Sequence, residues 1–210
     1  GRLVSGRSRV QSPPRAITCY PQTSKARAVK PSCVAGNPYM RWEVYGIFVI
    51  AVVGTSLHFT YELSGQNLLA AVFSAVNESV WEHLKLVFWP AAGFTLIQKV
   101  YFRRLPSSFL PAKAVGMLVM PAVILVMYYT SKLFGVESLA FDIFTFYLSV
   151  VLGQLSTIKL LKKNNLPKTA SYLGLTAIAT LAIAFTYFTF NPPHTPLFQD
   201  PVTGGYGLVR

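Results

Sequence analysis

Long apolar runs separated by short polar segments dominate the chain from about residue 42 onward. Each run holds about 20 residues, the length of helix that crosses roughly 30 Å of hydrocarbon at 1.5 Å per residue. The pattern therefore predicts an all-α, polytopic membrane helix bundle. Its five transmembrane helices are expected at about 42–61, 80–102, 112–134, 139–161 and 170–190.

A shorter apolar stretch at 68–76 lies between the first two predicted spans. It is too short to cross a bilayer, so it is expected to form an interfacial or re-entrant helix. Within the spans, glycines such as Gly116, Gly153 and Gly174 are expected at close contacts between helices, because small residues let membrane helices approach each other.

The organisation that follows is a leader or basic arm at 1–41, a five-span domain at 42–190 and a proline-rich tail at 191–210. The first 40 residues carry seven Lys or Arg and no acid, and Ser, Thr and Pro are frequent. Such segments are typical of organelle transit peptides. The Pro13-Pro14 pair favours a plastid over a mitochondrion, and hence a thylakoid or organelle inner membrane. The alternative is a disordered basic tail of a bacterial protein. Cys19 and Cys33 match no metal or redox spacing.

The composition agrees with a membrane protein. Hydrophobic residues make up 52% of the chain and charged residues 12%, against about 25% charged residues in soluble domains. The net charge of +12 does not indicate nucleic-acid binding, because the basic residues lie in tails and short loops and form no basic helix. The bilayer is therefore the expected partner, together with other membrane protein subunits.

The distribution of Lys and Arg predicts the orientation. With the N-terminus inside, sixteen of the 19 basic residues lie inside and only Lys85, Lys132 and Arg210 outside. The positive-inside rule then places the C-terminus outside. Six of the seven acids, all except Glu43, and all three histidines map to the outer half. Acids contribute little to orientation, so this grouping points to a site on the outer side.

Three segments supply the candidate site: the end of the first span, the start of the second span and the C-terminal tail. Ionisable groups at membrane depth are costly and are therefore functional candidates. Imidazole and carboxylate together form a ligand set that suits zinc, iron or manganese. The predicted metal ligands are His58, Glu78, Glu82, His83, His194 and Asp200.

Each of these residues also has a structural interpretation. Ser79 and Glu82 match the S-x-x-E capping box. His83 can hydrogen-bond a backbone carbonyl, and His58 can pair with Glu62 four residues later. Asp200 before Pro201 is typical of a turn.

The three segments also carry a resemblance. They read His58-Phe59-x-Tyr61-Glu62, Asn77-Glu78-Ser79-Val80-Trp81-Glu82-His83-Leu84-Lys85 and Pro193-His194-x-Pro196-Leu197-Phe198-x-Asp200-Pro201. Over about residues 42–210 the chain resembles a family of small bacterial integral membrane proteins of unknown function. The resemblance implies that the three segments act together, and it supplies no catalytic residues.

Two functions remain open on this basis. The leader favours a subunit or assembly factor of a plastid or mitochondrial membrane complex, with the outer His and carboxylate groups as a structural network. The alternative is a metal-dependent membrane enzyme that uses these groups as its active site. A transporter is weaker, because no matching ionisable residues are expected in the inner halves of the spans, where Gln98 and Gln154 are the polar amides.

Overall fold

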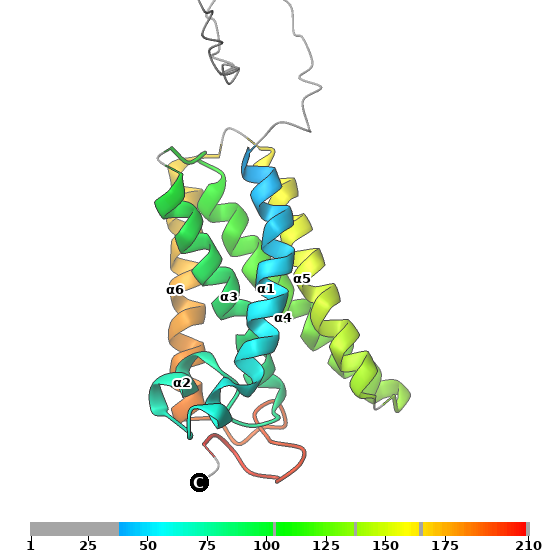
Figure 1. Ribbon diagram of the computed structural model, residues 1–210. Coiled ribbons are helices and arrows are strands. Elements are labelled where there is room, and N and C mark those ends of the chain that lie inside the picture. Colours follow the sequence, from blue (N-terminus) through cyan, green and yellow to red (C-terminus); the bar gives the residue numbers. More distant parts are fainter. Residues whose placement is uncertain (1–37, 103, 137, 164–165, 209–210) are drawn as a thin grey trace, which may run out of the picture. The chain divides into compact units, whose positions relative to one another are not determined.

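The computed structural model describes residues 38–102, 104–136, 138–163 and 166–208, so Cys19, Cys33 and nearly all of the leader lie outside the described residues. Helices and connecting loops make up the described part, which contains no strand. The helices are α1 (Pro38–Leu63), α2 (Leu68–Phe73), α3 (Val80–Tyr101), α4 (Phe109–Phe134), α5 (Leu139–Leu161) and α6 (Lys168–Phe190) (Figure 1).

Four helices, α1, α4, α5 and α6, are long and apolar enough to cross a membrane, which confirms the prediction of an all-α protein with membrane-spanning helices. The remaining predicted span, the second in the chain at about 80–102, corresponds to α3, which has 22 residues. Charged residues such as Glu82, Lys85 and Lys99 lower its hydropathy. A fifth span and the orientation of the chain therefore stay predictions.

The α3 helix provides the centre of the apolar core. Leu84, Val87 and Phe88 are at most 2% exposed. They pack with buried residues of the surrounding helices, including Ile50, Met117, Met120, Val150 and Phe185. Lipid tails are as apolar as these side chains, so van der Waals packing rather than the hydrophobic effect holds such helices together.

Glycines mark the closest helix contacts, as the sequence predicts. A Cβ on Gly116 of α4 would collide with Thr157 of α5, and a Cβ on Gly153 of α5 would collide with Met120 of α4. A Cβ on Gly174 of α6 would lie 2.9 Å from the Leu110 carbonyl oxygen. Larger residues at these positions would force α4 away from α5 and α6.

The short helix α2 occupies part of the stretch expected to be interfacial or re-entrant. Its six residues are too few to span a bilayer. Asn67 caps its start by accepting a hydrogen bond from the Leu69 backbone N–H at 2.8 Å. The helix lies at the same end of the bundle as the start of α3 and the C-terminal tail (Figure 1).

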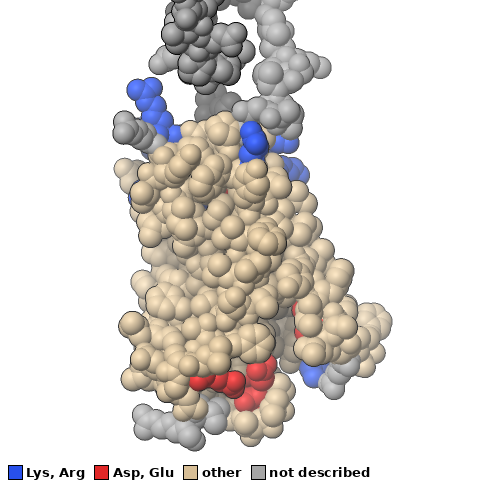
Figure 2. All heavy atoms as spheres, in the orientation of Figure 1, with Lys and Arg blue, Asp and Glu red and all other residues tan. Residues whose placement is uncertain are grey.

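The two ends of the bundle differ in charge. Figure 2 shows most Lys and Arg side chains at the end where α1 begins and α3 ends, which we call the basic end. Asp and Glu side chains gather at the opposite end, which we call the acidic end and which also carries α2 and the tail. The tail is held there by a 3.1 Å hydrogen bond from the Trp81 backbone N–H to the Leu197 carbonyl oxygen.

Candidate functional site

Three of the six predicted metal ligands meet at the acidic end. His58 comes from α1, Glu78 from the loop before α3, and His83 from the first turn of α3. One Glu78 carboxylate oxygen lies 3.5 Å from His83 Nε2 and 3.9 Å from His58 Nε2. One ligand atom from each residue falls within 4.8 Å of the others, which is compatible with a single shared metal ion. We call these residues the triad.

The loop between α2 and α3 positions Glu78 through its neighbours. The Asn77 side chain accepts a hydrogen bond from the Ser79 backbone N–H at 2.9 Å and donates one to the Gly207 carbonyl oxygen at 2.8 Å. Ser79 has an extended backbone and precedes the first residue of α3. Because hydrogen bonds fix Asn77 and Ser79 on either side of it, Glu78 is held beside the start of α3, next to His83.

The orientation of His83 leaves one ring nitrogen for the site. Its Nδ1 lies 2.8 Å from the Ser79 carbonyl oxygen. A carbonyl can only accept, so Nδ1 carries the proton in this contact and Nε2 faces Glu78. The expected hydrogen bond to a backbone carbonyl is therefore present. Metal-ligating histidines usually make this kind of contact with their second nitrogen, so the structural and metal-binding interpretations of His83 are compatible.

Glu78 is suited to act as an anion in the triad. Its hydrogen bond with His83 is the main reason that its pKa lies below the usual value, and the charges of His83 and His58 add to this effect. Partial burial acts in the opposite direction. The Glu78 side chain is 49% exposed and those of both histidines are 32% exposed, so a metal ion could reach the ligand atoms from solvent.

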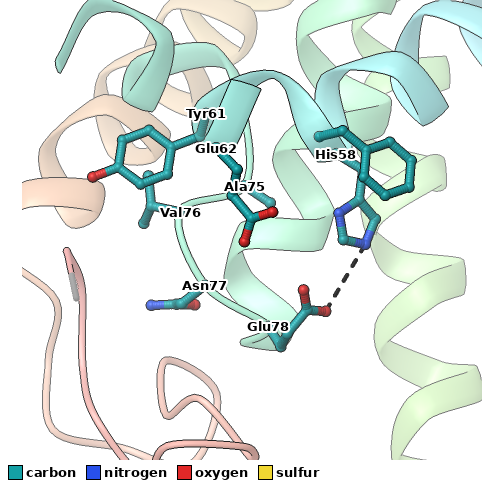
Figure 3. A pocket seen from close by; sticks show the side chains of 8 residues that line it. His58, Tyr61, Glu62, Ala75, Val76, Asn77 and Glu78 are labelled. Atoms are coloured by element: carbon teal, nitrogen blue, oxygen red, sulfur yellow. Dashed lines mark ion pairs between the residues drawn. The ribbon is translucent and has the colours of Figure 1, made fainter. Parts of the chain in front are cut away.

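A cavity of about 100 Å³ adjoins the triad (Figure 3). It has room for a few water molecules, since a cavity needs about 10–15 Å³ of water-accessible volume to hold one. Figure 3 shows Glu62 between Tyr61 and His58 on the cavity wall. The Glu62 carboxylate forms no hydrogen bond or ion pair with any other residue in the described part of the chain. The cavity lining is His58, Phe59, Tyr61, Glu62, Ala75, Val76, Asn77 and Glu78.

Glu82 lies apart from the triad in a buried ion pair. One carboxylate oxygen is 2.6 Å from Lys85 Nζ and accepts a hydrogen bond from the Val76 backbone N–H at 3.1 Å. Ser79 makes no side-chain capping hydrogen bond. The capping box expected from the sequence is therefore wrong: Glu82 reaches back beyond the helix start to Val76.

Lys85 explains why Glu82 is held in this way. Its ammonium group is 0% exposed. Besides Glu82, it donates to the Ala71 carbonyl oxygen at 2.9 Å and to Thr189 Oγ1 at 2.8 Å. These contacts use all three N–H groups and tie α2, α3 and α6 together. The charge distribution along the sequence places Lys85 only as an outer charge, although Glu82 three residues before it on the same helix is the local signal of this pair.

The remaining two predicted ligands shape the tail. The His194 ring packs on Tyr206 with 4.6 Å between ring centroids. Asp200 is 3% exposed and accepts hydrogen bonds from the Val202 backbone N–H at 2.9 Å and from Thr203 Oγ1 at 2.7 Å. Asp200 is therefore a turn residue, as the alternative interpretation held, and neither side chain belongs to the triad.

A second cluster lies near the basic end and was not foreseen. Lys113 Nζ of α4 contacts both carboxylate oxygens of Glu43 in α1, at 2.7 and 2.6 Å. The side-chain amides of Gln98 in α3 and Gln154 in α5 donate to the same carboxylate, at 3.0 and 3.2 Å. We call these four residues the basic-end cluster. It corrects the expectation that the inner halves of the spans hold no matched ionisable residues.

Comparison with known proteins identifies a family for the chain but assigns it no activity. The model of a family described as a family of unknown function (DUF6512) matches residues 34–208. Neither the curated proteins nor the solved structures include a significant match. The geometry of the triad is therefore the basis for a functional proposal.

Proposed function

The chain belongs to the DUF6512 family, a family of unknown function, and we propose from its own geometry that it is a metal-dependent membrane enzyme that activates water at its acidic end. One observation carries this proposal: His58, Glu78 and His83 offer three ligand atoms within 4.8 Å of one another. They do so beside a cavity in which Glu62 has no partner among the described residues.

The donor set favours zinc, with iron or manganese as alternatives. Two imidazoles and one carboxylate are the three protein ligands of several catalytic zinc sites, which keep a fourth position for water or substrate. A metal ion in such a site lowers the pKa of bound water to about 7. Here His58, Glu78 and His83 would hold the ion. Glu62, on the wall of the same cavity, could accept a proton from the water.

The proposal includes a placement in the membrane. The α3 helix would be the fifth span, with the basic end inside and the triad, α2 and tail outside, as the positive-inside rule predicts. The acid-free, Ser- and Pro-rich leader supports an organelle membrane, a thylakoid in preference to a mitochondrial membrane. The substrate would then approach from the lumenal side or from the outer leaflet.

Cobalt substitution tests the proposal directly. The protein, purified in mild detergent, is loaded with one equivalent of Co²⁺, and its visible spectrum is recorded before and after adding acetohydroxamate. We expect a cobalt band that shifts with acetohydroxamate, because a catalytic site keeps an exchangeable position. His83→Ala should lose the band. His194→Ala, which alters a histidine outside the triad, should keep it.

The opposite results are informative. A wild-type protein without a cobalt band would show that the triad does not bind this metal. A band that is insensitive to acetohydroxamate would indicate a closed, structural metal site and would overturn the enzymatic proposal.

A subunit or assembly factor of an organelle membrane complex is the second candidate. It is favoured by the large exposed apolar surface of three helices: only 17% of the apolar stretch of α6 and 28% of those of α1 and α5 are buried. Other membrane subunits could cover these faces. Co-purification from the native membrane in a discrete larger complex would support this role, and a monomer in every mild detergent would count against it.

A further inference from the structure

The basic end presents many cations and no exposed acid within the described residues. The only acid near this end in the described part of the chain is Glu43, which is 0% exposed and is paired with Lys113. Figure 2 shows the blue side chains projecting from this end. The exposed basic residues are Arg41, Lys99, Arg104, Lys159, Lys162, Lys163 and Lys168.

These cations are spread across the end of the bundle rather than gathered in one patch. They come from the start of α1, the end of α3 and the loop after it, the end of α5 and the loop after it, and the start of α6. Each therefore lies within a few residues of an apolar helix. A set of charges at the ends of several neighbouring helices matches a planar layer of headgroups better than a single docking protein.

An aromatic cluster lies at the same level. The Trp42 ring packs against those of Tyr101 and Phe102 in tilted and edge-on arrangements, with ring centroids 4.7 and 5.5 Å away. Tyr39 lies 4.7 Å from Phe102. Tyrosine and tryptophan are enriched where membrane proteins meet the headgroup layer. The aromatic cluster therefore indicates the depth at which the cations meet the membrane.

We propose that the basic end binds the headgroups of anionic phospholipids and enriches them around the protein. Lysine and arginine side chains near a membrane surface attract anionic lipids, with an effect of about fivefold per residue. The interaction is electrostatic and fades beyond the screening length. This inference does not depend on the metal site, because the basic end lies at the opposite end of the bundle.

Tryptophan quenching by brominated lipids tests the proposal with an internal control. Trp42 lies near the basic end, whereas Trp81 and Trp89 belong to the half of α3 nearer the acidic end. The double variant Trp81→Phe/Trp89→Phe reports on the basic end, and Trp42→Phe reports on the other half. Each is reconstituted in vesicles of phosphatidylcholine and phosphatidylglycerol at about equal amounts, with bromine on one lipid or the other.

We expect brominated phosphatidylglycerol to quench Trp42 at least twofold more strongly than brominated phosphatidylcholine. Trp81 and Trp89 should show no such preference. About 1 M salt, where the screening length is about 3 Å, should abolish the preference. Lys162→Gln/Lys163→Gln/Lys168→Gln in the Trp42 reporter should weaken it, and Lys132→Gln at the acidic end should not. Equal quenching by the two lipids would overturn the proposal and would favour an acidic protein as the partner of these cations.

Discussion

The basic-end cluster and the triad are both built around a glutamate with nitrogen-bearing neighbours, yet their surroundings differ. Glu43 and Lys113 are at most 3% exposed. The Glu43 carboxylate meets Lys113, Gln98 and Gln154. In the triad, by contrast, Glu78 is 49% exposed and borders a cavity.

This difference in exposure indicates a structural role for the basic-end cluster and a binding role for the triad. An ionised group in a membrane bundle is costly unless it is paired. In the basic-end cluster the Glu43 carboxylate is fully buried and contacts Lys113, Gln98 and Gln154, so it is not accessible to a ligand from solvent. The triad retains ligand atoms that face a cavity, which is the arrangement expected of a site for an ion or a substrate.

The largest expected effect comes from breaking the basic-end cluster. Lys113→Met keeps a long apolar side chain, but it removes the ammonium that lies over the rings of Phe94 and Phe109 and leaves the buried Glu43 charge without its cation. We expect the free energy of unfolding to fall by about 3–5 kcal/mol, measured by denaturant titration in detergent.

Two variants sharpen that test. Lys99→Met removes an exposed lysine and should change the free energy of unfolding by less than about 0.5 kcal/mol. Glu43→Leu/Lys113→Met removes both charges and should recover much of the loss, because a buried ion pair can often be replaced by apolar residues. A loss below about 1 kcal/mol in Lys113→Met would show that the pair does not stabilise the bundle as described.

The Glu82–Lys85 pair should give the next largest effect. Lys85→Met leaves Glu82 buried without its cation and frees the Ala71 carbonyl oxygen, so we expect a loss of about 3 kcal/mol. Amide hydrogen exchange should rise in α2, since Lys85 is the side chain that joins α2 to α3 and α6. Unchanged exchange in α2 would contradict this role.

The triad should contribute strongly to the free energy of unfolding only when a metal ion is bound. In metal-free protein, His83→Ala should lower the free energy of unfolding by less than about 1 kcal/mol, as for other partly exposed pairs. Metal at 100 times its dissociation constant should stabilise the wild-type protein by about 2.7 kcal/mol and the variant by much less. Thermal unfolding with and without Zn²⁺ measures both. Equal stabilisation of the two proteins would place the metal elsewhere.

The smallest expected effect is a pH dependence from Glu78. Its pKa in the folded protein is lowered, chiefly by the hydrogen bond with His83. The corresponding stability is present above the usual carboxyl pKa and is lost as the pH falls through the lowered value. The free energy of unfolding of the wild-type protein should exceed that of Glu78→Gln at neutral pH, and this gap should close in acid; denaturant titration of both proteins over a range of pH measures it. Because Glu78 is half exposed, the gap should stay below about 1 kcal/mol.

The sequence predicted those structural features that depend on the spacing of nearby residues. The apolar runs predicted the helices, since crossing a bilayer requires about 20 residues. Glu78 and His83 are joined by a short loop and one helical turn, so their proximity followed from the local pattern. The sequence could not separate the ligand and turn interpretations of Asp200, because both need a carboxylate in a tight loop.

The basic-end cluster could not be predicted because its residues come from four different helices. The predicted spans at about 42–61 and 112–134 already contain Glu43 and Lys113, but they do not show which helices pack together. In the structure Glu43 of α1 and Lys113 of α4 are at most 3% exposed and in contact. A residue pair that is 70 positions apart leaves no local signal, and only the packing of α1 against α4 brings it together.

Metal analysis of the untreated protein shows whether the triad binds a metal ion. The protein would be purified in mild detergent without a histidine tag or chelator and analysed for zinc, iron and manganese. We expect about one equivalent of metal in the wild-type protein and in His194→Ala, and almost none in His83→Ala. Absence of metal from the wild-type protein, or equal metal content in His83→Ala, would contradict the assignment of His58, Glu78 and His83 as a metal site.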